Sequence, residues 1–297
     1  MLVIGGGIAG CMAALAAVQS GAEVMLVSRA PGATALYAGG MEIAADLREV
    51  RSLATSQPYH PFVRLGLNDF ELVTLLDEVC YRVQEALARA GLRLAGNWRT
   101  TGWYADVHGG VRPAQLVPES VQPGELGGLQ GKRVAVVGVS AIGDYDAVAT
   151  AGALEEAGVR ALPVTVTMEL PQSASLSDLF GRQAPAVREI AEAVAYPPGL
   201  VQLPENGFEL LATLPSPHGW RLQQALDAAL ADHGVDVAQG AVASVRARGR
   251  EVEAALTAST ELPADQFVLA SGRYISGGLV KHRLVREPVC DLGVFHE

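Results

Sequence analysis

The chain has 297 residues, of which 49% are hydrophobic, and a formal net charge of -10. This length allows a large core, and the acidic balance excludes a nucleic-acid-binding surface, which needs a basic stripe. The three cysteines are scattered and lack Cys-x-x-Cys spacing, so they indicate neither a disulfide framework nor a metal site. The sequence contains no uninterrupted apolar run of about 20 residues, the length that a membrane-spanning helix needs.

The N-terminus combines a short aliphatic strand, a glycine-rich turn and an Ala-rich helix. Residues 2–4 are typical of a buried strand, the helix is expected to reach Gln19, and a second strand follows at residues 23–27. The Gly-x-Gly-x-x-Gly pattern permits a tight turn, close approach of a pyrophosphate, and close packing of the helix on the strand. We therefore expect a dinucleotide to contact Gly5, Gly7, Ile8, Ala9 and Gly10.

The end of the second strand departs from the usual dinucleotide pattern. An Asp or Glu is expected there to accept hydrogen bonds from the adenosine ribose. This chain has Ser28 followed by Arg29. A serine binds a ribose more weakly, and an arginine can face a phosphate or solvent. We expect looser ribose binding that involves both residues.

A loop of small residues follows, up to Met41. Its Thr34 and the run Ala38-Gly39-Gly40 resemble the Thr/Ser-x-x-x-Ala-x-Gly-Gly loop of flavoproteins related to fumarate reductase and succinate dehydrogenase. Small residues let a backbone press against a planar ring and hydrogen-bond a pyrophosphate. We expect these four residues to contact a flavin, with a plain surface loop as the alternative.

The middle of the chain predicts a long amphipathic helix at residues 69–90 and a second βαβ unit at residues 132–166. In the turn of that unit Ser140 replaces the middle glycine, which favours a structural role over a second nucleotide site. Its helix is expected to begin at Asp144. A further helical stretch is expected at residues 173–195.

A helix is expected at residues 220–231, with Arg221 in its first turn. A cation there is electrostatically unfavourable, so the position indicates either a bound anion or an ion pair with a nearby carboxylate. The strands that follow return to the nucleotide domain. We expect Val242 near the adenine, and the strand end Ala270-Ser271-Gly272 beside the cofactor.

These elements predict an α/β fold with a discontinuous Rossmann-like FAD/NAD(P)-binding domain and an inserted α/β second domain. The first comprises residues 1–66 and 235–297. The second comprises residues 67–234.

The N-terminal turn together with residues 26–29, and four further blocks, resemble the B-subunit family of anaerobic glycerol-3-phosphate dehydrogenases. The further blocks are residues 60–66, 136–140, 213–223 and 268–288, of which the last is the clearest. The resemblance implies a flavoprotein subunit that helps to oxidise sn-glycerol 3-phosphate to dihydroxyacetone phosphate and passes electrons toward a quinone. It also implies two partners from the same dehydrogenase, a larger catalytic flavoprotein and a membrane-associated iron–sulfur protein. The expected location is cytoplasmic, peripheral on the inner face of the membrane.

The resemblance also bears on the cofactor, on how tightly it is held and on the alternative functions. The family is assigned FMN, whereas the glycine turn favours FAD. Family members extend beyond the Arg286 region into a segment that closes over the flavin, so we expect weak flavin retention in this chain. The alternative functions are a fumarate-reductase-like flavoprotein acting on a dicarboxylate and a non-catalytic structural subunit.

Four side chains are candidates for the chemistry. Oxidation of a secondary alcohol needs a group that takes the hydroxyl proton and cations that hold the phosphate. His60 and His218 lie in expected turns that can face a cleft, although an exposed turn histidine is the alternative for His60. Arg221 and Arg286 are the candidate phosphate ligands.

Overall fold

The computed structural model describes residues 1–43, 56, 61–187, 191–214, 216–249, 251–281 and 284–294. The chain forms two units. The first comprises Met1–Leu36, Arg89–Gly91 and Trp220–Glu297, and the second comprises Tyr37–Ala88 and Leu92–Gly219. The domain division predicted from the sequence remains our proposal about which segments fold together.

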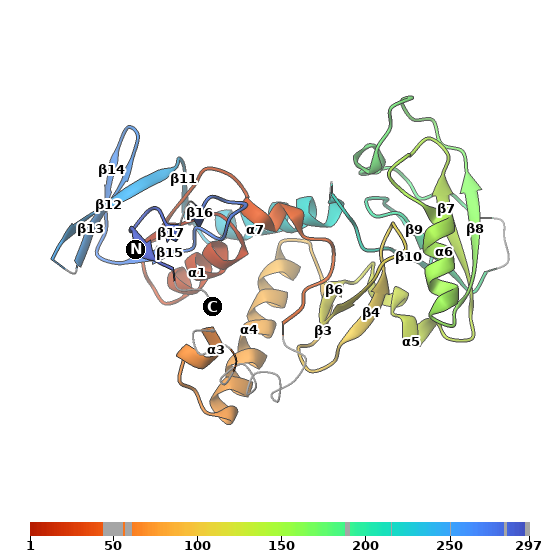
Figure 1. Ribbon diagram of the computed structural model, residues 1–297, viewed down its shortest axis with the longest axis horizontal. Helices are drawn as coiled ribbons and strands as arrows, with labels where there is room; N and C mark the ends of the chain where they lie inside the picture. The colour runs from red at the N-terminus through yellow and green to blue at the C-terminus, as the bar shows by residue number, and fades with distance from the viewer. Residues whose placement is uncertain are drawn as a thin grey trace. The chain divides into compact units, whose positions relative to one another are not determined.

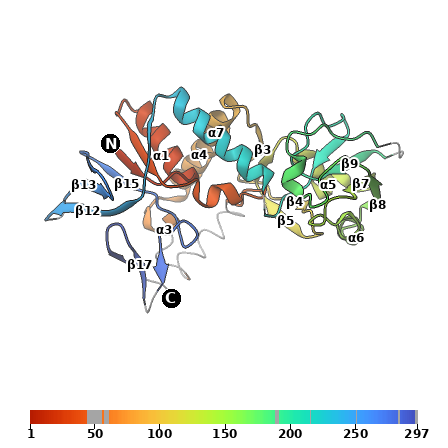
Figure 2. The ribbon, with the colours of Figure 1, turned by 90° about the horizontal axis from the view of Figure 1, so that it is seen from above.

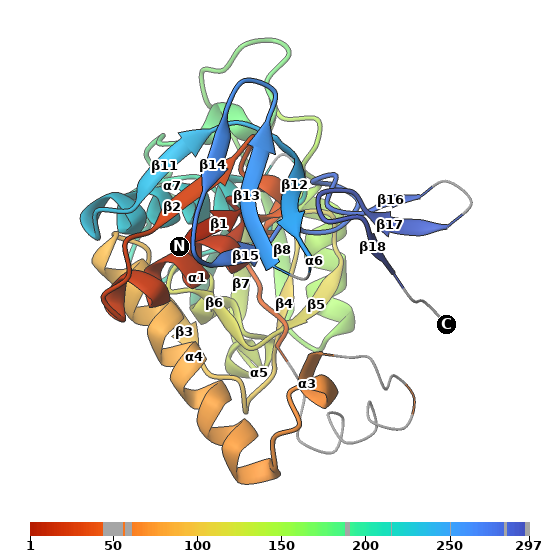
Figure 3. The ribbon, with the colours of Figure 1, turned by 90° about the vertical axis from the view of Figure 1, so that its left-hand side faces the viewer.

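The first unit is built on a four-stranded parallel sheet in the order β11-β2-β1-β15 (Figure 3). Helix α1 makes the crossover from β1 to β2, as in dinucleotide-binding folds. This arrangement confirms the predicted α/β class. The elements are β1 (Leu2–Ile4), α1 (Ile8–Gln19), β2 (Met25–Ser28), β11 (Asp236–Gln239) and β15 (Phe267–Leu269).

Two small antiparallel sheets extend this unit, in the orders β12-β13-β14 and β16-β17-β18. Figure 1 labels the strands of the first sheet, and Figure 3 labels those of both. Ala255 and Val289 from these additions are buried in one cluster with Leu2, Ile4 and Val27 of the parallel sheet. The additions are therefore part of the core. Their bounds are β12 (Val242–Arg248), β13 (Glu251–Thr257), β14 (Glu261–Pro263), β16 (Val280–Lys281), β17 (Val285–Glu287) and β18 (Leu292–Gly293).

The second unit contains another parallel sheet, in the order β10-β9-β7-β8, whose strands are labelled in Figure 1. Helix α6 packs on β7 and β8 (Figure 2). The apolar strand β7 is almost fully buried, as expected of a central parallel strand. The bounds are β7 (Arg133–Val139), α6 (Ala147–Glu156), β8 (Arg160–Val166), β9 (Ala193–Tyr196) and β10 (Gly207–Glu209).

Shorter elements complete the chain, with β3 paired to β6 and β4 paired to β5. Among the helices that the structure describes, none is both long and apolar enough to cross a membrane. The remaining bounds are η1 (Gly32–Leu36), α3 (Pro61–Arg64), α4 (Asp69–Arg89), β3 (Leu94–Gly96), β4 (Gly102–Ala105), β5 (Val111–Ala114), β6 (Leu116–Pro118), η2 (Gln122–Gly124), α5 (Leu126–Leu129), η3 (Leu176–Leu179) and α7 (Pro217–Asp232).

The helix expected at residues 173–195 is wrong. The described residues there form the short 3-10 helix η3 and, from Ala193, the strand β9. Strand β9 is buried along its length and pairs with β7, with Ala193 opposite Val134. This pairing satisfies the backbone and outweighs the helix propensity of alanine.

Two predicted helix starts also move. Helix α6 begins at Ala147, because Asp146 is its N-cap and accepts hydrogen bonds from Val148 N and Ala149 N. Asp144 instead accepts a hydrogen bond from Leu176 N. The carboxylate of Asp146 thus takes the place that an anion would occupy at this helix end. Helix α7 likewise begins at Pro217 and not at residue 220.

Candidate functional site

The glycine-rich turn at the end of β1 is sterically closed on one side and open on the other. Gly5 has a φ of +119°, and a Cβ there would overlap the carbonyl oxygen of Ala270. A Cβ on Gly10 would overlap the oxygen of Gly5, so both positions require glycine. At Gly7 the nearest described neighbour of such a Cβ is Thr34 Oγ1, at 3.3 Å. Gly7 therefore faces open space.

That space is a cavity of about 610 Å³ at the carboxyl end of the parallel sheet. Five separate segments of the first unit line it. The carboxyl end of the sheet is where ligands bind in open α/β folds. Most of the predicted cofactor contacts lie around it. They are Gly5, Gly7, Ile8, Ala9, Ser28, Arg29, Thr34, Val242, Ala270, Ser271 and Gly272.

The amino end of α1 is arranged to bind an anion. Ile8 and Ala9, its first two residues, line the cavity. In α1, all of whose residues are described, the first turn has no acidic side chain. Thr34 Oγ1, which is buried, accepts a hydrogen bond of 2.8 Å from Ile8 N and so ties η1 to the turn. The positive end of the helix dipole is thus presented to the cavity.

Cys11 supports the turn from behind. Its Sγ lies 3.5 Å from the carbonyl oxygen of Gly6, to which the thiol donates. Burial raises the pKa of Cys11 from 9.0 to about 12, and the charge of Asp227 adds to this shift. The side chain is therefore a neutral thiol at physiological pH, not a nucleophile.

The cavity fits the pyrophosphate of a dinucleotide, since it combines backbone that a ligand can approach closely with a helix amino end. Comparison with protein families gives the same answer. A family model described as FAD binding domain matches residues 1–172. The chain belongs to the FAD binding domain family. This match supports FAD as the cofactor, as the glycine turn predicted.

Curated relatives extend over almost the whole chain. It is 27% identical to the B subunit of anaerobic glycerol-3-phosphate dehydrogenase from Yersinia enterocolitica serotype O:8 / biotype 1B, over 99% of this chain and 79% of that protein. It is 28% identical to the protein of the same name from Pectobacterium atrosepticum, over 99% and 80%. The resemblance predicted from the motifs is confirmed, and the family and these names support a flavin-dependent oxidoreductase subunit.

Among solved structures, the 3-ketosteroid delta1-dehydrogenase from Sterolibacterium denitrificans matches with 14% identity and a TM-score of 0.41. The match covers 91% of this chain and 47% of that chain. At this TM-score the likeness carries no argument about function.

The other predicted flavin contacts belong to the second unit. Ala38 accepts a hydrogen bond from Ala212 N, and a Cβ on Gly40 would lie 2.9 Å from the Cβ of Ala114. A Cβ on Gly39 would lie only 2.6 Å from Cδ2 of His218. The structure thus brings two predicted site residues, Gly39 and His218, into contact.

The four catalytic candidates differ in their surroundings. His218 is 1% exposed, and its Nε2 donates to the oxygen of Leu210 at 3.1 Å. Arg286, on β17, is exposed and forms an ion pair of 3.3 Å with Asp291. Arg221 is half-buried on α7. His60 lies outside the described residues.

The placement of Arg221 in a first helical turn is wrong. Helix α7 begins at Pro217, so Arg221 is its fifth residue. Proline is favoured in a first turn because its missing N–H needs no partner there. Ser216 precedes it and accepts a hydrogen bond from Gly219 N at 3.0 Å. The helix dipole therefore gives no reason to expect an anion at Arg221, since the dipole acts within the first turn.

Sequence reasoning missed part of the cavity lining. Pro288 and Val289 follow β17, and Ile275 lies in the loop after β15, yet all three line the cavity. The run Ser276-Gly277-Gly278 could have indicated that this loop returns to the strand end. In the structure, a Cβ on Gly278 would overlap the backbone oxygens of Ser271 and Gly272, so the loop packs closely there.

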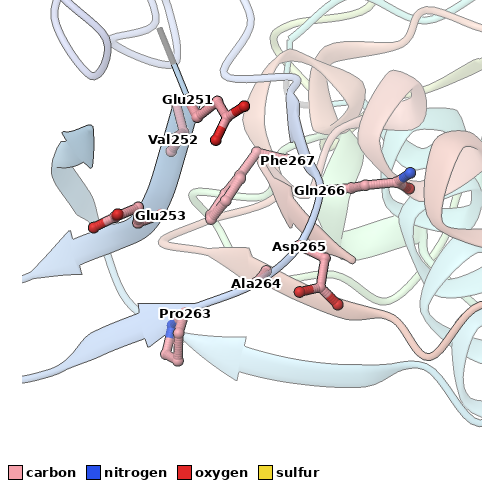
Figure 4. Close-up of a pocket in the computed structure, with 8 residues that line it drawn as sticks. All are labelled: Glu251, Val252, Glu253, Pro263, Ala264, Asp265, Gln266 and Phe267. Carbon is pink, nitrogen blue, oxygen red and sulfur yellow. The ribbon is translucent and has the colours of Figure 1, made fainter. Parts of the chain in front are cut away.

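A wider hollow of about 860 Å³ lies in the first unit away from the glycine turn (Figure 4). Glu251, Glu253 and Asp265 supply carboxylates to its lining. This acidic character is unsuited to a pyrophosphate, so the smaller cavity is the candidate FAD site.

Proposed function

We propose that this chain is the FAD-binding subunit of a dehydrogenase that oxidises sn-glycerol 3-phosphate to dihydroxyacetone phosphate and passes electrons toward a quinone. The observation that carries the proposal is the glycine-turn cavity, in a chain whose curated relatives are named as the B subunit of that dehydrogenase. Bound FAD supplies the two-electron acceptor for such an oxidation.

Different residues would bind the cofactor, take the hydroxyl proton and hold the substrate phosphate. The turn at Gly5, Gly7 and Gly10 and the amino end of α1 bind the pyrophosphate, and Thr34 fixes the loop above it. His218 is our candidate for the group that takes the hydroxyl proton. Arg221 and Arg286 are our candidates for holding the substrate phosphate, because an arginine can bind it through two parallel hydrogen bonds.

The proposed assembly contains two further proteins, a catalytic flavoprotein and an iron–sulfur protein. The support is the word subunit in the relatives' names. We place the complex on the cytoplasmic face of the membrane, to which this chain would be held by its partners.

The test is the absorption spectrum of the chain, purified alone and with its partners, under anaerobic titration. We expect a flavin spectrum that glycerol 3-phosphate bleaches in the complex. A flavin that ignores glycerol 3-phosphate and, once reduced, is reoxidised by fumarate would replace the proposal with a dicarboxylate enzyme. A colourless chain in both preparations would indicate a structural subunit.

A further inference from the structure

The cavity at the glycine turn has an unusual charge for a dinucleotide site. Among its described lining residues there is no Asp or Glu, and Arg29 is the one charged side chain. The chain as a whole has a net charge of -10. The cavity is therefore a locally positive region, to which the amino end of α1 adds, on an acidic protein.

The departure from the usual dinucleotide-binding pattern lies at the end of β2. Ser28 is the last residue of this strand and pairs in register with Gln239 of β11. In dinucleotide folds a carboxylate at this point binds the ribose 2′-hydroxyl, whereas a nearby arginine accommodates a 2′-phosphate. A carboxylate would also repel such a phosphate. This chain has the arginine and lacks the carboxylate.

The local contacts leave the Arg29 side chain available to bind a ribose 2′-phosphate. The Ser28 hydroxyl donates to the oxygen of Ala30 at 2.8 Å, so it folds back on its own loop. Arg29 is exposed at the cavity, and no carboxylate in the described part of the chain forms an ion pair with it. A guanidinium in this setting binds a phosphate dianion through charged hydrogen bonds.

We propose that the cavity binds adenosine nucleotides that carry a phosphate on the ribose 2′-hydroxyl, with Arg29 as the specificity-determining residue. This inference rests on the proposed placement of FAD in the same cavity. Nucleotides of this class then compete with FAD for the adenosine end of the site, which makes flavin occupancy sensitive to their concentration.

The test is displacement of FAD from the purified holoprotein, followed by the fluorescence of released flavin. The probes are AMP, adenosine 2′,5′-bisphosphate and adenosine 3′,5′-bisphosphate. We expect the 2′,5′ compound to act at about tenfold lower concentration than AMP, the lower end for a charged hydrogen bond, because Arg29 is exposed to solvent. The 3′,5′ compound should act at a concentration close to that of AMP.

Two variants make the assignment specific. Arg29→Ala should bring the 2′,5′ compound to within about twofold of AMP, and Ser28→Asp should make AMP the better competitor. Arg248→Ala, which removes an exposed arginine on β12, is the control and should change nothing. Equal potency of AMP and the 2′,5′ compound on the unmodified protein, or a difference that survives Arg29→Ala, would overturn the proposal. Equal potency of the two bisphosphates would overturn the assignment to the 2′ position.

A wrong placement of FAD in this cavity would give a different set of results. If FAD does not occupy this cavity, none of the three nucleotides displaces it, and Gly7→Val retains flavin. If only the specificity is wrong, AMP and the bisphosphates displace FAD equally and Gly7→Val still loses it.

Discussion

Gly5, Gly7 and Gly10 belong to one motif but have different roles. A side chain at Gly5 or Gly10 would collide with backbone oxygens, whereas one at Gly7 would project toward the cavity beside Thr34. Substitution at Gly7 therefore separates ligand binding from folding, which the other two positions do not allow.

Gly7→Val should give a folded protein that has lost its FAD, because the branched side chain takes the space of the pyrophosphate. The measurements are flavin absorbance per mole of protein and the circular dichroism spectrum. Gly143→Val is the matched control, since no described atom lies within 4 Å of a Cβ there. A soluble Gly7→Val protein with full flavin content would move the pyrophosphate away from this turn.

Glu287 holds the turn that brings Pro288 and Val289 to the cavity. Glu287 is 6% exposed, and its carboxylate accepts hydrogen bonds from Val289 N at 2.8 Å and Cys290 N at 2.7 Å. Glu287→Gln replaces one acceptor with a donor that faces an N–H group. We expect a loss of about 1–3 kcal/mol in the free energy of unfolding, measured with urea. The free energy of unfolding of Glu253→Gln, a change at a more exposed position, should stay within about 0.5 kcal/mol of that of the unmodified chain. An equal loss in both variants would contradict the role of Glu287.

The buried thiol of Cys11 predicts lower stability in alkali. Its folded-state pKa of about 12 lies above the ordinary value of 9.0, so the stabilisation is complete below pH 9 and is lost as pH rises toward 12. Burial raises the pKa of Tyr37 and Tyr145 as well, and both act in the same direction.

Unfolding free energies measured between pH 8 and pH 11 test this expectation. In Cys11→Ala the decline above pH 9 should be shallower by up to about 1.4 kcal/mol per pH unit, the effect of one proton. Cys290→Ala is the control, since that thiol is only partly buried. Identical slopes in Cys11→Ala and the unmodified chain would show that Cys11 does not titrate on unfolding in this range.

Among the helices, the first residue of α7 determines which of its side chains the helix dipole can influence. With Pro217 as its first residue and Ser216 as its cap, α7 places Arg221 beyond the turn in which the dipole acts. A role for Arg221 in phosphate binding now depends on its side chain alone. That role is a proposal that kinetics can decide.

Arg221→Ala in the assembled complex should raise the KM for glycerol 3-phosphate by about tenfold or more, the effect of one charged hydrogen bond, and leave the flavin content unchanged. Arg221→Lys should recover part of the loss, because a point charge replaces a two-pronged donor. Arg248→Ala on β12 is the control. An unchanged KM in Arg221→Ala would assign the phosphate site to Arg286 or to a partner protein.

In the molecule as a whole, the candidate FAD cavity is formed within the first unit, by segments from both ends of the chain. Ligand binding to the folded state alone stabilises it by an amount that grows with the logarithm of ligand concentration. The stability of the protein should therefore depend on the concentration of free FAD.

Added FAD should raise the Tm of dialysed protein progressively, with about 2.7 kcal/mol of stabilisation at 100 times the Kd. Differential scanning fluorimetry over a range of FAD concentrations measures this, and Gly7→Val should show no shift. A Tm that does not change with FAD concentration would contradict binding of FAD to the folded chain.

Features that depend on neighbouring residues could be predicted from the sequence. The glycine turn, the helix α1 and the long helix α4 were all predicted, and Asn68 caps α4 by exchanging hydrogen bonds of 2.9 and 3.0 Å with Glu71. Each rests on steric or hydrogen-bonding constraints within a few residues, so a local pattern suffices. The FAD binding domain family could be predicted for the same reason, since its turn is a continuous motif.

The pairing of segments that are distant in the sequence could not be predicted in this way. Strand β9 exists because its backbone pairs with β7, a partner about 60 residues away, and alanine-rich sequence does not reveal such a partner. Likewise, the cavity gains Ile275, Pro288 and Val289 from separate loops, and its charge depends on which side chains those loops bring together. Pairing and cavity formation are set by burial and long-range packing, which no local pattern in one sequence encodes.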